Sequence, residues 1–160
     1  MSINLRVKSE EEMEYLGSLL GSLLEAGDLV YLSGELGAGK TTFTRGVARG
    51  LAYPGRVNSP TFTIMNIYQA VLPIYHFDFY RLGEGDLVDL GLEDYLGREG
   101  ICVVEWPQAG EQVLPGSAVY VNIVLEDDDY DRPRKVIVRG EGARFHEIVE
   151  RLKEFVASCN

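Results

Sequence analysis

The sequence predicts an α/β fold of three layers, in which helices cover both faces of a central, mainly parallel sheet. Short apolar runs alternate with helical stretches, a glycine-rich loop joins one apolar run to a helix, and the chain closes with an antiparallel hairpin and a helix. Its 160 residues suit one domain over residues 1–160, without internal repeats or linkers.

The first third of the chain is expected to hold a strand, a helix and a second strand. Residues 3–7 alternate between apolar and polar types, and Ser9 opens a capping box with Glu12. The helix that follows carries leucines at helical spacing, and Gly27 is expected to end it. Residues 29–32 then form a compact apolar strand that leads directly into the glycine-rich loop.

The remainder of the chain predicts further strands and helices. Residues 41–51 form a helix in spite of two glycines, and a proline breaks the polar loop 56–61. The next expected elements are strands 63–69 and 71–77, a helical or irregular stretch 84–96, strand 100–105, hairpin strands 119–125 and 134–139, and helix 143–157.

Charge and cysteine content limit the classes of function. The chain has 25 acidic against 15 basic residues, a formal net charge of −10. Such a surface repels a phosphate backbone, so direct binding of nucleic acid is not expected, although the excess of acid also serves solubility. Cys102 and Cys159 lie far apart and match neither a zinc-binding spacing nor a disulfide framework.

The sequence also indicates a cytoplasmic location. The amino terminus has no apolar run typical of a signal peptide, and no segment approaches the roughly 18 apolar residues that a membrane helix needs. We therefore expect no membrane partner.

Residues 34–41 carry the strongest motif, Gly-Glu-Leu-Gly-Ala-Gly-Lys-Thr, which fits the phosphate-binding pattern G-x-x-x-x-G-K-[ST] between a strand and a helix. Glycines let backbone N–H groups turn inward around phosphates, and the helix amino terminus adds partial positive charge. Lys40 would reach the β- and γ-phosphates, and the Thr41 hydroxyl would bind Mg²⁺. The motif predicts a P-loop NTPase fold that binds ATP with Mg²⁺; a glycine-rich turn without a ligand is the alternative.

Two acids at the ends of apolar strands are candidates to complete the metal site. Glu105 ends the run 101–104, the usual design of a Walker B strand, and Asp78 ends the run 74–77. Either carboxylate could hold Mg²⁺ directly or through water, or polarise the attacking water, although acids at strand ends are commonly just solvated. Trp106 follows Glu105 and should lie near the same site.

The segment 58–62, Asn-Ser-Pro-Thr-Phe, lies where many P-loop proteins have a switch. Its hydroxyls could touch Mg²⁺ or the γ-phosphate and report bound ATP, whereas an ordinary Ser-Pro turn is the alternative. His76 alternates with aromatic residues along a strand and is interpreted as facing one side of the sheet. The aromatic residues expected to be core are Tyr75, Phe77, Phe79 and Tyr80.

Four motifs follow one another along the chain. They are residues 34–42, Ser-Pro-Thr-Phe at 59–62, His-Phe-Asp-Phe-Tyr-Arg at 76–81 and Val-Glu-Trp-Pro at 104–107. Together they resemble the bacterial TsaE (formerly YjeE) ATPases of tRNA threonylcarbamoyladenosine biosynthesis. The resemblance runs from about Ser9 to Pro115, with a looser match to the end, and the last three motifs are much more specific than a P-loop.

The resemblance implies a protein that binds ATP with Mg²⁺ and hydrolyses it weakly when alone. Its hydrolysis would support turnover of the TsaB–TsaD pair, which transfers a threonylcarbamoyl group to adenosine 37 of tRNA, so tRNA would be met only through that complex. By position, Lys40, Asp78 and Glu105 match catalytic residues, and Thr41, Asp78 and Glu105 match metal-binding ones. The matched nucleotide-binding positions are Glu10, Leu36, Gly37, Ala38, Gly39, Lys40, Thr41, Thr42, Thr61, Trp106 and Arg132.

Two other P-loop functions compete with this interpretation. A small-molecule or nucleotide kinase would usually carry a lid with several arginines, and no arginine-rich insert is present. A GTP-dependent switch would ordinarily carry an Asn-Lys-x-Asp motif that reads guanine, which this sequence lacks.

Overall fold

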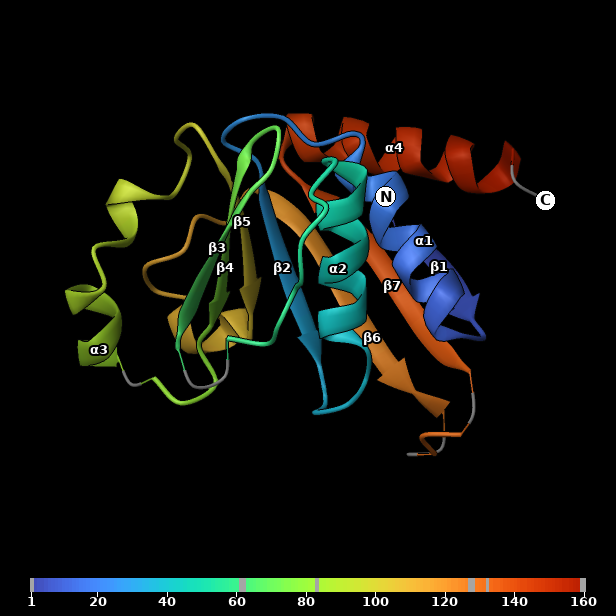
Figure 1. The fold of residues 1–160 in the computed structure, drawn as a ribbon, viewed down its shortest axis with the longest axis horizontal. Helices are drawn as coiled ribbons and strands as arrows, with labels where there is room; N and C mark the ends of the chain where they lie inside the picture. Colours follow the sequence, from blue (N-terminus) through green and yellow to red (C-terminus); the bar gives the residue numbers. More distant parts are fainter. Residues whose placement is uncertain (1, 61–62, 83, 127–128, 132, 159–160) are drawn as a thin grey trace.

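A computed structural model of the protein describes residues 2–60, 63–82, 84–126, 129–131 and 133–158. Within these residues seven strands form one sheet in the order β1-β7-β6-β2-β5-β4-β3 (Figure 1). The strands are β1 (Ser2–Val7), β2 (Leu29–Gly34), β3 (Met65–Gln69), β4 (Pro73–Asp78), β5 (Ile101–Glu105), β6 (Ala118–Leu125) and β7 (Arg134–Glu141).

The sheet is mixed, so the expectation of a mainly parallel sheet is wrong. The four central strands β6, β2, β5 and β4 run parallel to one another. The outer pairs β1–β7, β7–β6 and β3–β4 are antiparallel. Consecutive strands such as β3 and β4 are joined by a turn that is too short for the crossover that parallel strands require. The predicted C-terminal hairpin, β6 and β7, is confirmed, and its β6 strand extends the parallel centre.

The three predicted layers are present. On one face the apolar sides of α1 (Glu10–Gly21), α2 (Lys40–Gly50) and α4 (Ala143–Ser158) share a core with the sheet. The short helices α3 (Glu84–Asp89), η1 (Leu92–Asp94) and η2 (Pro107–Gly110) lie with a second, smaller apolar cluster on the other face (Figure 1). No helix in the described part of the chain combines the length and apolar character needed to cross a bilayer.

Helices α1 and α2 pack so closely that glycine is required between them. A Cβ atom at Gly46 would collide with the Glu14 carbonyl oxygen, and one at Gly17 would collide with that of Phe43. This close contact explains why α2, the predicted helix after the glycine-rich loop, contains glycines although glycine lowers helix propensity. Helix α1 itself ends at Gly21, earlier than the expected end at Gly27.

Candidate functional site

The glycine-rich loop lies between β2 and α2, at the carboxyl edge of the central strands. Gly37 and Gly39 have φ angles of 80° and 121°, a region that side-chain-bearing residues rarely adopt. Gly39 is the N-cap of α2 and provides no side-chain hydrogen bond to the first turn. The first N–H groups of α2 therefore receive no side-chain capping bond at Gly39, and such N–H groups at a helix amino terminus can bind an anion.

Lys40 points back into this loop and is 5% exposed. Its Nζ donates to the carbonyl oxygens of Gly34 at 2.5 Å and Glu35 at 3.1 Å, and lies 4.7 Å from the centroid of the Trp106 ring. Burial lowers the pKa of Lys40, while the charges of Glu105, Asp78 and Glu35 act in the opposite direction. The Lys40 amine thus lies close to acidic side chains in a largely buried site.

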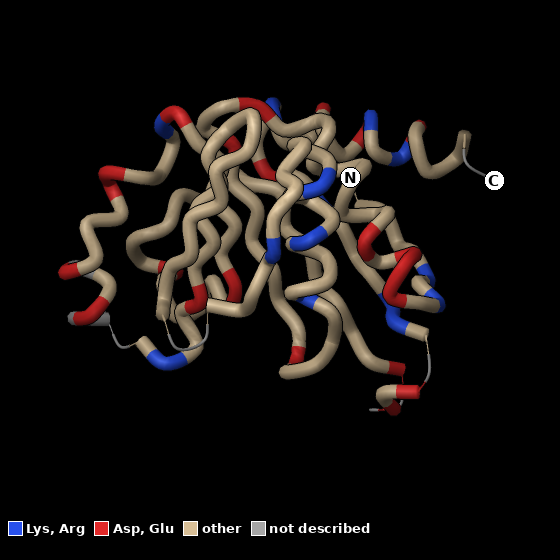
Figure 2. The backbone as a smooth tube through the Cα atoms, viewed as in Figure 1, with Lys and Arg blue, Asp and Glu red and all other residues tan. Residues whose placement is uncertain are grey.

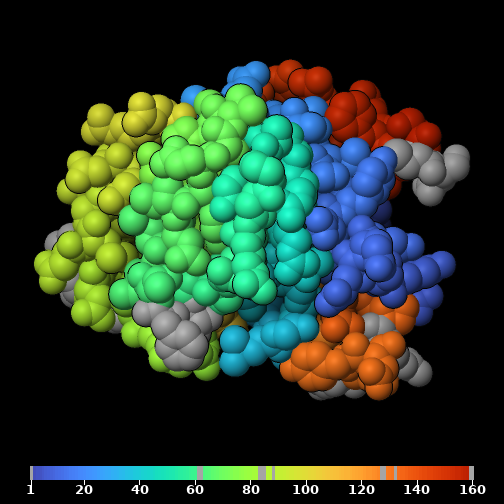
Figure 3. Space-filling model, viewed as in Figure 1, coloured from blue at the N-terminus to red at the C-terminus, as the bar shows by residue number. Residues whose placement is uncertain are grey.

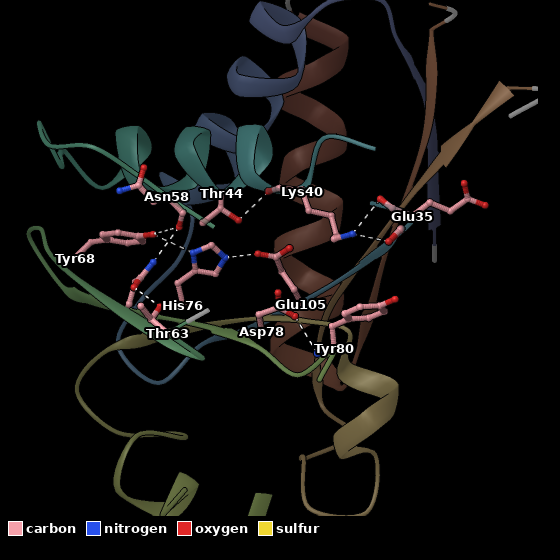
Figure 4. A network of polar contacts seen from close by, with 12 residues as sticks. Glu35, Lys40, Thr44, Asn58, Thr63, Tyr68, His76, Asp78, Tyr80 and Glu105 are labelled. Atoms are coloured by element: carbon pink, nitrogen blue, oxygen red, sulfur yellow. Dashed lines mark hydrogen bonds and ion pairs between the residues drawn. The ribbon is translucent and has the colours of Figure 1, made fainter. Parts of the chain in front are cut away.

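The two candidate acids are neighbours across the sheet. Asp78 ends β4 and Glu105 ends β5, and they are partners in the parallel register. Both are buried, at 6% and 3% exposure. One Asp78 oxygen accepts from the Tyr80 backbone N–H at 2.9 Å, and Glu105 Oε2 lies 2.6 Å from His76 Nε2 (Figure 4). The fold thereby brings both predicted carboxylates to one place.

Trp106 lies beside Lys40, as expected from its place after Glu105. Its φ is 56°, its backbone N–H donates to Leu32 at 3.1 Å, and its ring centroid lies 4.8 Å from that of Tyr80. Tyr80 is 50% exposed, so its assignment to the core was wrong, whereas Phe77 and Phe79 are buried as predicted. Within the described residues the buried Trp106 Nε1 atom has no hydrogen-bond partner.

These groups surround a cavity of about 580 Å³. The predicted residues that line it are Glu10, Leu36, Gly37, Ala38, Gly39, Lys40, Thr41, Thr42, Asp78, Glu105 and Trp106. Ser59, from the predicted switch segment, also lines it. Thr61 and Arg132 lie outside the described residues. A volume of this size is within the range of about 300–1,000 Å³ that is typical of small-molecule pockets.

Several lining residues were missed by the sequence interpretation, and two of them, Tyr130 and Arg134, are bonded directly to the glycine-rich loop. The Tyr130 hydroxyl donates to the Leu36 carbonyl at 3.0 Å, and Arg134 Nε donates to that of Ala38 at 3.1 Å. Figure 3 shows the hairpin tip (orange) beside the phosphate loop (blue) at one edge of the molecule. The sequence signal that could have identified them is weak: Tyr130 lies within the acidic stretch 126–131, and Arg134 follows it closely.

The oxygen-bearing side chains around the cavity suit Mg²⁺ better than they suit a metal ion that is coordinated entirely by protein side chains. Among the residues that the structure describes, no three histidine, cysteine, aspartate or glutamate side chains gather to form a metal site. The cavity instead offers the neighbouring carboxylates of Asp78 and Glu105 together with the Thr41 hydroxyl. Mg²⁺ prefers oxygen ligands, keeps several waters, and is commonly held by one or two carboxylates together with phosphate oxygens.

The chain resembles proteins with one shared description. A family model described as "Threonylcarbamoyl adenosine biosynthesis protein TsaE" matches residues 7–136. The Bacillus subtilis tRNA threonylcarbamoyladenosine biosynthesis protein TsaE is 40% identical over 148 residues, 92% of this chain and 91% of the relative. The Haemophilus influenzae protein of the same name is 44% identical over 106 residues, 65% of this chain and 67% of the relative.

A solved structure has the same fold. The crystal structure of Bacillus subtilis YdiB superposes with a TM-score of 0.85 and 34% sequence identity, over 98% of this chain and 97% of that one. The similarity therefore extends from the sequence to the arrangement of the whole sheet and its helices.

Proposed function

This chain belongs to the TsaE family of tRNA threonylcarbamoyladenosine biosynthesis proteins, and we propose that it is the Mg²⁺-dependent ATPase of that pathway. In this proposal it acts in the cytoplasm, binds ATP, hydrolyses it slowly when alone, and supports a TsaB–TsaD-type complex that modifies adenosine 37 of tRNA. The single observation that carries the proposal is the convergence of the phosphate loop, Lys40, Asp78 and Glu105 on one cavity.

The cavity has the chemistry that a nucleoside triphosphate needs. The amino terminus of α2 and the glycine loop would bind the phosphates through backbone N–H groups. Lys40 would exchange its bonds to the Gly34 and Glu35 carbonyls for the β- and γ-phosphate oxygens. These groups together can neutralise much of the charge of a triphosphate.

The acids opposite Lys40 suit the metal and the attacking water. Mg²⁺, when bound with ATP, would supply positive charge to the phosphate oxygens during transfer. Thr41, Glu105 and Asp78 are the residues that would hold it. Glu105 is oriented by His76, and Asp78 by the Tyr80 N–H, so each acid presents a defined direction to the cavity.

Slow hydrolysis by the isolated chain follows from a missing positive charge. In P-loop enzymes an arginine finger is worth about 10³- to 10⁵-fold in turnover. Arg45 is paired with Glu14 at 3.9 Å, and Arg134 donates to the Ala38 and Tyr130 carbonyls. No arginine of the described chain, Arg56 and Arg81 included, belongs to a recognisable finger motif, so a partner protein is the proposed source of this charge.

Contact with tRNA is proposed to be indirect. Acidic positions outnumber basic ones and are spread over the whole backbone (Figure 2), in line with the net charge of −10. A surface of this sign does not favour a nucleic-acid backbone. The partner complex is then the component that holds the tRNA.

The test is steady-state phosphate release at matched MgATP, with and without purified TsaB and TsaD partners. We expect slow release by the isolated chain and a large rise with partners, and no rise with Lys40→Ala. Fast turnover that partners leave unchanged would contradict the proposal. A parallel panel with GTP and candidate phosphate acceptors distinguishes a GTP switch or a kinase, which would consume GTP or phosphorylate an acceptor.

A further inference from the structure

A chain of buried polar contacts runs from Glu105 away from the cavity. His76 is fully buried on β4, and its Nε2 lies 2.6 Å from Glu105 Oε2. On the other side of the ring, His76 Nδ1 lies 3.1 Å from the hydroxyl oxygen of Tyr68 on β3. That hydroxyl also lies 2.9 Å from the carbonyl oxygen of Asn58 (Figure 4). Three contacts thus connect a candidate metal-binding acid to the segment after α2.

A count of the available hydrogens shows that the hydrogen bonds between Glu105, His76, Tyr68 and Asn58 can be arranged in two ways. For a neutral imidazole, Nε2–H donates to the Glu105 carboxylate and Nδ1 is left as an acceptor. The Asn58 carbonyl is an acceptor as well, and burial raises the pKa of Tyr68, so the phenol keeps its one hydrogen. That hydrogen can be donated to His76 or to Asn58, but not fully to both. A shift of the imidazole therefore changes how strongly Tyr68 holds Asn58.

Asn58 keeps a second bond in either arrangement. The Asn66 side-chain amide donates to the same carbonyl at 3.0 Å, and Thr63 Oγ1 donates to Asn66 Oδ1 at 2.8 Å. Loss of the Tyr68 bond would thus loosen the segment without leaving the carbonyl unsatisfied, which makes the change small in energy and reversible.

The other acid is tied to the same segment by its backbone. The Asp78 N–H donates to the carbonyl oxygen of Ile64 at 2.9 Å, and Ile64 N–H donates to Pro60 at 2.8 Å. Ile64 has a φ of 70°, which is strained for a β-branched residue. Asn58 and Ile64 are therefore connected by hydrogen bonds to Glu105 and Asp78, the two acidic residues of the cavity, and Ile64 is held in a conformation that costs energy.

We propose that His76 and Tyr68 are positioning residues: His76 orients the Glu105 carboxylate, and Tyr68 transmits a change at Glu105 to the segment that begins at Asn58. This inference rests on the proposed function, since nucleotide and Mg²⁺ are what would move Glu105. Residues 58–60, residues 63–64 and the adjoining edge strand β3 are then the surface whose conformation changes with nucleotide state.

The decisive variant is Tyr68→Phe, which removes the hydroxyl and keeps the ring. Backbone amide exchange over residues 57–69 is measured with and without MgATP, and binding is followed separately by calorimetry and by Trp106 emission. We expect MgATP affinity to stay within about threefold of the wild type, and the nucleotide-dependent change in exchange to fall about fivefold, the effect of one buried hydrogen bond.

The matched control is Tyr53→Phe. The Tyr53 ring packs on Tyr68 with centroids 5.2 Å apart, but among the described residues its hydroxyl donates to the Arg56 carbonyl, at 3.3 Å, and not to Asn58 or His76. This variant should respond to MgATP as the wild type does. An equal loss in both variants would mean that general loosening of the aromatic cluster is responsible, and would overturn the inference.

Two substitutions of His76 separate its two bonds. In His76→Gln the amide nitrogen can replace Nε2 and hold Glu105, so MgATP affinity should stay within about threefold while the segment response is lost. In His76→Asn the amide can replace Nδ1 and hold Tyr68, and Mg²⁺-dependent affinity should fall about tenfold because Glu105 is no longer oriented. If either protein fails to fold, the isosteric Tyr68→Phe variant decides alone.

The outcomes distinguish the inference from the function on which it rests. Wild-type and Tyr68→Phe proteins that bind MgATP and change exchange equally would overturn the inference and leave the proposed ATPase intact. A wild-type protein that does not bind MgATP would overturn the proposed function, and the inference with it.

Discussion

Buried acidic residues lie at both edges of the central strands, and their hydrogen-bond partners differ between the amino edge and the carboxyl edge. At the amino edge, Asp28 precedes β2 and is 5% exposed. Its two oxygens accept from Arg144 of α4 at 3.3 and 2.9 Å, and one also accepts from the Glu25 N–H at 2.7 Å. At the carboxyl edge, the carboxylates of Asp78 and Glu105 each have one hydrogen-bond partner among the described residues, Tyr80 N–H and His76 respectively.

The difference separates a buried charge that is paired within the fold from buried charges that face a cavity. Asp28 is bonded on both oxygens, to a guanidinium and to a backbone N–H group, and it does not line the cavity beside the glycine-rich loop. The carboxyl-edge acids and Lys40 face a cavity. Buried polar groups are normally satisfied, and a set of buried charges facing a cavity indicates a functional site.

The strongest test of this comparison is Lys40→Ala. It removes the cation that would meet the β- and γ-phosphates, so MgATP affinity or turnover should fall by about 100-fold or more, with little effect on folding. Calorimetry and phosphate release measure the first effect, and circular dichroism measures the second. A folded variant with wild-type affinity and turnover would refute the phosphate-loop assignment.

The amino edge should behave in the opposite way. Asp28→Ala removes a buried carboxylate whose partner Arg144 is 35% exposed, and should lower the free energy of unfolding by about 2 kcal/mol, without changing MgATP affinity. Denaturant unfolding gives the first value. The control is Glu25→Ala, because Glu25 reaches the same arginine at 3.4 Å from a side chain that is 75% exposed, and should cost less than about 1 kcal/mol.

The two acids of the carboxyl edge should themselves differ. Glu105→Ala should weaken Mg²⁺-dependent ATP binding about tenfold more than Asp78→Ala, since Glu105 has the Walker B position and is oriented by His76. Asp78→Ala should reduce mainly hydrolysis or its coupling to a partner. Titrations of ATP at several Mg²⁺ concentrations measure the order, and the reverse order would exchange the two roles.

The smallest expected effect is a change in the fluorescence emission of Trp106. Trp106, the only tryptophan, lies 4.7 Å from Lys40 Nζ, so its emission should change when MgATP moves Lys40. The Asp28→Ala variant should keep this fluorescence response, because Asp28 lies at the amino edge of the central strands and Trp106 at the carboxyl edge. Unaltered emission in a sample that calorimetry finds saturated would contradict the placement of Trp106 beside the phosphates.

Most elements were predictable because their patterns are local. The capping bond from Glu12 N–H to Ser9 Oγ, at 3.1 Å, and the hairpin β6–β7 follow from residues close in sequence or from simple alternation. The end of α1 was misplaced because Leu23 and Leu24 continue an apolar pattern after the helix has ended, and both are buried in the turn that follows.

The candidate site was predictable only in part. The motif 34–41 locates the phosphate loop, and the strand ends locate Asp78 and Glu105. Their adjacency depends on β4 pairing with β5, which no local pattern specifies. His76 was interpreted as one polar residue on a face of the sheet, because its bond to Glu105 joins residues 29 positions apart.

By itself the sequence determined most strands and helices and the position of the glycine-rich loop, since each depends on spacing within a few residues. Only the tertiary structure decided which distant groups meet. Tyr130 reaches Leu36 across 94 positions and Arg144 reaches Asp28 across 116. Such pairs form only when the whole sheet and its helices pack, because the entropy of closing long loops must be offset by burial elsewhere.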